Sequence, residues 1–293
     1  DKELWIHKQE RFTLNVNYFH VVFTLPNELN VLCLIDPKFM YKALFDISAE
    51  TVKELSKDKK YLEAKIGFTS VLHTWGQNLS LHPHIHMIVP GGGIDSNGKW
   101  KNSKKKFFLP VKVVSKLFKG KFLSYTKKHF DQRKIKEEEQ FQNIIDACYS
   151  KDWVVYTKKP MKSAKHVVKY LGSYTHRIAI SNARIKKYED NKVTFSYKDY
   201  SNHNKIKEMT LEDTEFFRRY MMHVLPSNFM KIRHYGFLGN RNKEERIQAI
   251  RTATNTKDPG PPLIDYEQII SDILKRDVSI CIKCGQKRHR QLE

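Results

Sequence analysis

The chain has 293 residues, and its 53 Lys and Arg against 32 Asp and Glu give a formal net charge of +21. An excess of this size indicates a polyanionic partner, with nucleic acid first, because each neutralised phosphate releases counterions. The composition excludes a disordered protein, a membrane span of roughly 18 apolar residues and a disulfide framework, so a cytoplasmic protein with no membrane partner is expected.

Strands and helices alternate along the first part of the chain. β-branched and aromatic residues bounded by turn residues predict strands, and apolar residues at helical spacing predict helices. In chain order the sequence predicts a strand at 18–26, a helix over 38–60, and strands at 66–73 and 84–89. Gly91–Gly93 and residues 95–98 are expected to form a turn, after which 106–110 completes a hairpin.

The second part of the chain is predicted by the same patterns. Residues 111–150 are helical and basic, and the later elements are a short strand at 153–156, a helix over 163–179, a hairpin over 183–200 around Asp190-Asn191, and helices at Thr210–Val224 and Asn242–Ala253. Several strands joined through helices favour an α+β class with an antiparallel or mixed sheet.

The segment at 81–93 reads LHPHIHMIVPGGG. Side chains alternate faces along a strand, so His82, His84 and His86 point to the same side. Two imidazoles at i and i+2 can reach one metal ion, and unpaired buried imidazoles are costly. The pattern therefore predicts His84 and His86 as metal ligands.

A third ligand is needed for such a site. Gln77 lies seven positions before His84, where a turn would bring it back to the histidine face, and His82 and His73 compete for the same role. A neutral amide oxygen beside imidazoles suits Mg²⁺ or Mn²⁺ with open positions. An open divalent site polarises a phosphoryl oxygen.

The segment at 163–180 reads SAKHVVKYLGSYTHRIAI. At helical spacing its apolar residues form one stripe, and Tyr170, Tyr174 and Arg177 are neighbours along the edge of that stripe. A phenolate that attacks a phosphodiester would form a covalent phosphotyrosine. Taken alone, the segment is more typical of aromatic residues packed in a core than of a catalytic pair.

Together these motifs resemble a known family. HPHIHMIVPGGG, the later YLGSYTHRIAIS at 170–181 and the opening strand NYFHVVFTLP at 17–26 are similar to the two-tyrosine rolling-circle transposases of the insertion-sequence ninety-one family. These belong to the HUH endonucleases, whose His–hydrophobic–His motif matches His84-Ile85-His86. The similarity spans about residues 15–240.

The resemblance implies an HUH-type central antiparallel sheet (ferredoxin/RRM-like) flanked by helices, with a helical basic C-terminal extension. It also implies a bacterial, nucleoid-associated enzyme that cuts single-stranded DNA at the ends of a mobile element and leaves a 5′-phosphotyrosine. By this resemblance Tyr174 is the primary nucleophile and Tyr170 the second. The expected DNA contacts are Arg177, Lys165 and Lys169. Transesterification retains the bond energy, and no GxxxxGK[ST] loop occurs, so no nucleotide cofactor is expected.

The expected organisation has three parts. Residues 1–200 form the catalytic domain, 201–260 a helical C-terminal part of the transposase, and 261–293 a basic linker and tail. In the tail, Cys281 and Cys284 with His289 make half of a zinc site, against two free thiols as the alternative. Two other functions stay open: a rolling-circle replication initiator or relaxase-like nickase, and a non-catalytic nucleic-acid-binding module with structural histidines.

Overall fold

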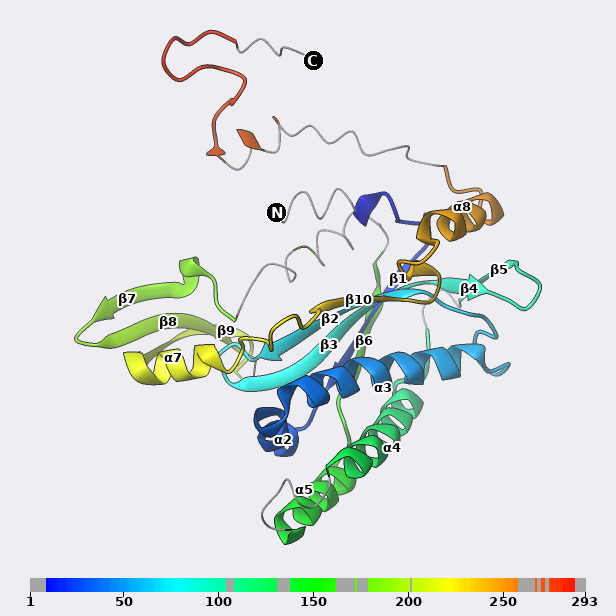
Figure 1. Cartoon of the computed structure of the whole chain (residues 1–293), viewed down its shortest axis with the longest axis horizontal. Coiled ribbons are helices and arrows are strands. Elements are labelled where there is room, and N and C mark those ends of the chain that lie inside the picture. The colour runs from blue at the N-terminus through cyan, green and yellow to red at the C-terminus, as the bar shows by residue number, and fades with distance from the viewer. Residues whose placement is uncertain are drawn as a thin grey trace.

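Five strands form one antiparallel sheet at the centre of the fold (Figure 1). The computed structural model describes residues 9–103, 108–130, 138–161, 172, 179–200, 202–257, 267, 270–271 and 274–287. The strands are β1 (Tyr18–Thr24), β2 (Phe68–Trp75), β3 (Leu81–Pro90), β6 (Val155–Met161) and β10 (Ile232–Tyr235), in the order β10-β2-β3-β1-β6. All neighbours are antiparallel, which confirms the α+β class and the antiparallel sheet.

Helices cover one face of this sheet. α3 (Pro37–Lys57) and α4 (Val111–His129) lie against it, with α2 (Asn30–Ile35) and α5 (Glu138–Ser150) beside them (Figure 1). The carboxylate of Asp36 caps α3 by accepting a hydrogen bond from the Phe39 nitrogen at 3.0 Å. Phe23 of β1 faces the helices, and its ring meets that of Phe118 from α4 edge-on, with the centroids 4.9 Å apart. The helix predicted over 38–60 is confirmed as α3, which ends earlier, at Lys57, and the helical prediction over 111–150 is confirmed by α4 and α5.

The hairpin after β3 differs from the prediction. β4 (Gly92–Ile94) pairs with β5 (Trp100–Asn102), so Gly92 and Gly93 lie in a strand, and residues 100–102 rather than 106–110 complete the hairpin. A Cβ atom on Gly92 would lie 2.4 Å from the Trp100 ring, so this close approach requires glycine. The turn is formed by Asp95, whose carboxylate accepts hydrogen bonds from the Asn97 and Lys99 nitrogens at 2.8 and 2.9 Å.

A second antiparallel sheet, here called the arm, contains β7 (Ile185–Glu189), β8 (Lys192–Asp199) and β9 (Lys205–Glu212), and α7 (Asp213–Met221) follows it. The hairpin predicted around Asp190-Asn191 is confirmed, and both residues have the positive φ that a tight hairpin turn needs. The helix predicted from Thr210 begins only at Asp213. Thr210 instead pairs with Thr194 of β8, where the two hydroxyl oxygens are 2.8 Å apart.

The C-terminal part contributes one longer helix. α8 (Lys243–Ala253) confirms the helix predicted at Asn242–Ala253 and packs Ile247 and Ile250 in a cluster with Leu14 and Phe237. The remaining short helices are η1 (Asn27–Leu29), η3 (Asn182–Arg184) and η4 (Gly236–Leu238). The helix predicted over 163–179 lies outside the described residues except for two of them. Within the described ranges, no helix has the length and apolar character to cross a membrane.

Candidate metal centre

The sheet face opposite the helices carries a cluster of imidazoles. His84 and His86 alternate along β3 with Ile85 and Met87, which are fully buried on the helix side. His73 on β2 is the partner of His84 across the two strands. One ligand nitrogen from each of His73, His84 and His86 lies within 4.8 Å of the other two, so these described residues could hold one metal ion.

Hydrogen bonds orient two of these rings. Nδ1 of His84 donates to the carbonyl oxygen of His82 at 2.6 Å. Nδ1 of His86 lies 2.8 Å from Nε2 of His20, a buried residue of β1. Both contacts engage Nδ1, an arrangement usual for histidine ligands, in which an outer partner holds one ring nitrogen and the other nitrogen ligates the metal ion.

Burial keeps His84 and His86 neutral. The pKa of His84 is lowered to about 4, chiefly because water is excluded, while the hydrogen bond to the His82 carbonyl opposes this shift. Exclusion of water, with His84 and His20 nearby, holds the pKa of His86 well below its ordinary value. A neutral imidazole is the form that binds a metal ion. Three imidazole ligands fit a divalent cation that keeps open coordination positions.

The turn between β2 and β3 contains Gln77, the predicted third ligand. Its side-chain nitrogen donates to the Tyr200 hydroxyl at 3.4 Å, and its main-chain carbonyl oxygen accepts a hydrogen bond from the Arg184 guanidinium. The structure brings His73, the competing candidate, beside His84 and His86. A role for Gln77 as a ligand stays a prediction.

Tyr170 and Tyr174, the predicted nucleophiles, lie outside the described residues, as do the predicted DNA contacts Arg177, Lys165 and Lys169. Their roles therefore stay predictions.

Sequence reasoning missed three residues around the cluster. His20 contacts His86, and Trp75 stacks on His73 with ring centroids 4.7 Å apart. Nζ of Lys231 lies 4.8 Å from the centre of the Trp75 ring, and burial lowers the pKa of this lysine to about 8. One signal was available: His20 is the single histidine in the otherwise apolar strand predicted at 18–26.

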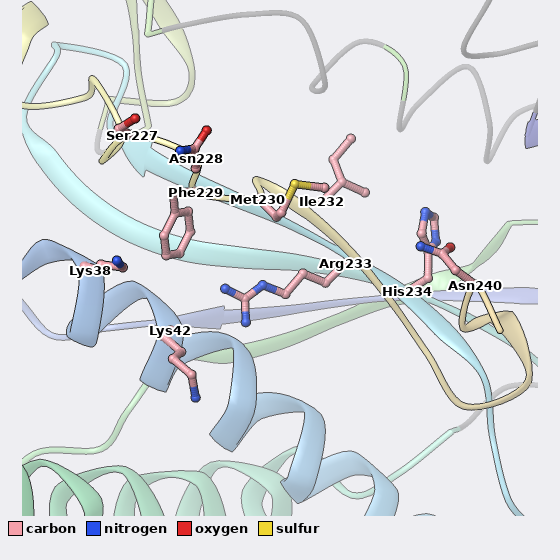
Figure 2. A pocket seen from close by; sticks show the side chains of 10 residues that line it. All are labelled: Lys38, Lys42, Ser227, Asn228, Phe229, Met230, Ile232, Arg233, His234 and Asn240. Carbon is pink, nitrogen blue, oxygen red and sulfur yellow. The ribbon is translucent and has the colours of Figure 1, made fainter.

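A basic cavity lies beside β10, at the edge of the sheet (Figure 2). This β10 cavity has a volume of about 620 Å³, and its lining includes Lys38 and Lys42 of α3, Arg233 of β10 and the ring of Phe229. The Arg233 guanidinium lies 5.3 Å from the centre of the Phe229 ring and pairs with Asp46 at 3.5 Å. Cations beside an aromatic ring are suited to the phosphates and bases of a nucleic acid strand.

The tail places its two cysteines at a tight turn. The Cys281 nitrogen donates to the Gln286 carbonyl, and the Gly285 nitrogen donates to the Cys281 carbonyl, both at 2.8 Å. Gly285 has a φ of +71°, which favours glycine. The third predicted ligand, His289, lies outside the described residues, so zinc binding by Cys281 and Cys284 stays a prediction.

Fold and site together define an α+β protein with a candidate metal centre on an antiparallel sheet. Residues 67–246, more than half of the chain, match the family Y2_Tnp, described as "Putative transposase". The chain thus belongs to this transposase family.

Two curated relatives agree with the family. Over 296 residues the chain is 39% identical to "Putative transposase y4qJ" of Sinorhizobium fredii (strain NBRC 101917 / NGR234). The alignment covers 96% of this chain and 74% of the relative. Over 289 residues it is 29% identical to "Transposase for insertion sequence element IS801" of Pseudomonas savastanoi pv. phaseolicola, with 97% and 69% covered. No solved structure matches the chain.

Proposed function

We propose that the chain is a DNA transposase of an insertion-sequence element that nicks and rejoins single-stranded DNA by metal-dependent tyrosine transesterification. The observation that carries this proposal is the cluster of His73, His84 and His86 in a member of a transposase family. The relative named for IS801 supports the type of element. The two-tyrosine motif supports the covalent step.

His73, His84 and His86 would hold the divalent cation, Mg²⁺ or Mn²⁺, with Gln77 as a further proposed ligand. A bound cation of this kind polarises a phosphoryl oxygen. Ligating imidazoles carry no negative charge, so they leave the charge of the cation available to an anionic phosphate. Lys231, above Trp75 at the edge of the cluster, adds a cationic group for the DNA backbone.

Tyr174 is the proposed first nucleophile and Tyr170 the second. The phenolic oxygen bonds to phosphorus, and the bond from phosphorus to the 3′ oxygen of the preceding nucleotide breaks. The phenol loses its proton, and the leaving 3′ oxygen takes one up as a hydroxyl. A phosphotyrosine ester replaces a phosphodiester, so attack by a 3′-hydroxyl rejoins the DNA without a nucleotide cofactor.

The DNA is proposed to contact Arg177, Lys165 and Lys169, which would neutralise backbone phosphates. The β10 cavity is a further proposed contact, and the net charge of +21 supports a polyanionic partner. Of the three proposed parts of the chain, residues 201–260 supply β10 to the central sheet, which supports their place in the transposase unit. In the tail, Cys281 and Cys284 are proposed to bind Zn²⁺.

A cleavage assay tests the proposal. The chain is incubated with Mn²⁺ or Mg²⁺ and with labelled single-stranded oligonucleotides from both ends of the element that encodes it. We expect a covalent protein–DNA adduct and a fragment with a free 3′-hydroxyl. The adduct should be lost when Tyr170→Phe and Tyr174→Phe are combined and should persist in Tyr188→Phe, a matched change at an exposed tyrosine of the arm.

The two alternatives predict other outcomes. Binding of DNA with no adduct, with either metal and across all the oligonucleotides, would overturn the proposal and favour a non-catalytic nucleic-acid-binding module. Adducts on plasmid origin or transfer sequences, with none at the element ends, would favour a replication initiator or relaxase-like nickase.

A further inference from the structure

His20 makes an end-to-end contact with His86. Its side chain is 4% exposed, and its Nε2 lies 2.8 Å from Nδ1 of His86. The two rings are nearly coplanar, with an interplanar angle of 13° and centroids 5.1 Å apart. The distance between the centroids equals the N···N distance plus about one ring radius for each imidazole, as expected when the two rings meet nitrogen to nitrogen. The rings therefore do not overlap face to face, and the hydrogen bond runs in line with both of them.

A hydrogen bond between two neutral imidazoles holds one proton, and its position decides what His86 can bind. If His86 donates from Nδ1, its Nε2 carries the lone pair that an ion needs. If His20 donates instead, the proton of the neutral His86 ring is on Nε2, and that atom cannot ligate. The same constraint already holds at His84, because its Nδ1 partner is a carbonyl oxygen, which only accepts.

We infer that His20 is the positioning residue of the metal centre: it accepts the Nδ1 proton of His86 and thereby presents Nε2 of His86 to the cation. This inference rests on the proposed metal-dependent function and adds to it a residue that lies outside the ligand set. Outer partners of histidine ligands affect metal affinity by about 10- to 100-fold.

The strand register explains why this role belongs to β1. Val22 and His86 are partners across β1 and β3, and His20 lies two residues along β1 on the same face. Its neighbours Phe19 and Val21 are buried in the core on the opposite face, which fixes the backbone that carries the ring. A neutral imidazole acceptor orients His86 without adding a negative charge, whereas a carboxylate in that place would offset part of the charge of the cation.

The test uses the full chain with Mn²⁺ alone and no DNA. His20→Phe keeps a ring and removes the acceptor, and His20→Gln restores an acceptor through its amide oxygen. The matched control is His234→Phe, which removes a half-buried histidine of β10 bonded to Thr69 at 2.9 Å. We expect His20→Phe to weaken Mn²⁺ binding by about 10- to 100-fold, His20→Gln to recover most of the loss, and His234→Phe to bind like wild type.

A second measurement uses the wild-type chain and therefore does not require that any variant folds. Nitrogen NMR of the metal-free wild-type chain should show the His86 proton on Nδ1. A His86 proton on Nε2, or Mn²⁺ affinity unchanged in folded His20→Phe, would overturn the role of His20 while the metal centre stands. Absence of Mn²⁺ binding in wild type would overturn the metal centre and this inference together. Failure of the DNA cleavage assay with normal Mn²⁺ binding would overturn the proposed function alone.

Discussion

Single side chains decide how the imidazole cluster titrates. The pKa of His84 is lowered from 6.5 to about 4, chiefly because water is excluded from its surroundings. Between these two values the unfolded chain binds a proton that native His84 does not. The contribution of His84 to the free energy of unfolding therefore increases with pH between these two values and is lost as the pH falls from 6.5 to about 4.

We expect the metal-free protein to lose stability as the pH is lowered from about 6.5 to about 4, with His84 contributing at most about 1.4 kcal/mol per pH unit. Urea unfolding at a series of pH values measures this slope. His84→Gln should flatten it, whereas His203→Gln, at an exposed histidine of the arm, should leave it unchanged. An equal slope in His84→Gln and wild type would contradict the prediction.

The identity of the third ligand is also decided by one residue. We expect His73→Ala to weaken Mn²⁺ binding by at least about 10-fold, because it removes one of three imidazoles. His129→Ala, a change at a histidine bonded to Asp36, should bind Mn²⁺ like wild type. Isothermal titration compares both with Gln77→Ala, and a comparable loss there would show that the amide ligates as well. Wild-type affinity in His73→Ala would rule this histidine out.

At the scale of elements, the arm anchors the turn that joins the two ligand-bearing strands β2 and β3. The Asn78 carbonyl accepts a hydrogen bond from Nη1 of Arg219 at 3.3 Å. Leu79 has a positive φ of 62°, and its fully buried side chain packs in a cluster with Phe195 and Phe216. The relative position of His73 and His84 thus depends on contacts with the arm and with α7.

Truncation of Leu79 should therefore affect both stability and metal binding. We expect Leu79→Ala to lower the free energy of unfolding by about 2–5 kcal/mol, as for other buried leucines, and to weaken Mn²⁺ binding. Leu34→Ala, at a leucine of α2 that is 56% exposed, should change stability by no more than about 0.5 kcal/mol. Urea unfolding and Mn²⁺ titration measure both effects. Equal stabilities of the two variants would argue against an anchored turn.

Elements with strong local patterns were predictable, and those that depend on distant pairing were not. β3 and α3 have clear period-two and helical patterns, so their existence follows from the sequence alone. β10 is only IRHY, and it is a strand because it pairs with β2, about 160 residues earlier. The site divides in the same way: alternation on one strand predicts His84 and His86, whereas only the register across strands brings His20 to His86.

At the scale of the whole molecule, the net charge of +21 makes salt the main control on DNA binding. Each phosphate that a cation neutralises releases counterions, so affinity decreases steeply as salt increases. The β10 cavity places two lysines from one helix, Lys38 and Lys42, near Arg233 and a phenylalanine ring. Substitution of these lysines tests whether single-stranded DNA binds at the β10 cavity.

We expect Lys38→Ala combined with Lys42→Ala to weaken binding of single-stranded DNA and to reduce the salt slope by at most about 2. Fluorescence anisotropy with a labelled oligonucleotide at several salt concentrations measures the slope. Lys59→Ala with Lys60→Ala, in the exposed loop after α3, removes the same charge and should change the slope less. Identical slopes for the two double variants would place the DNA away from the β10 cavity.

The imidazole cluster contains residues from three strands, and His20 and His86 are 66 positions apart in the sequence. During translation, no nascent chain has the whole cluster until the codons for β3 have been read and that segment has left the ribosome. Gene remnants truncated before the codon for His84 would encode β1 and β2 but neither member of the histidine pair. Decayed copies of such an element that end before β3 would therefore lack the ability to bind Mn²⁺ at this cluster.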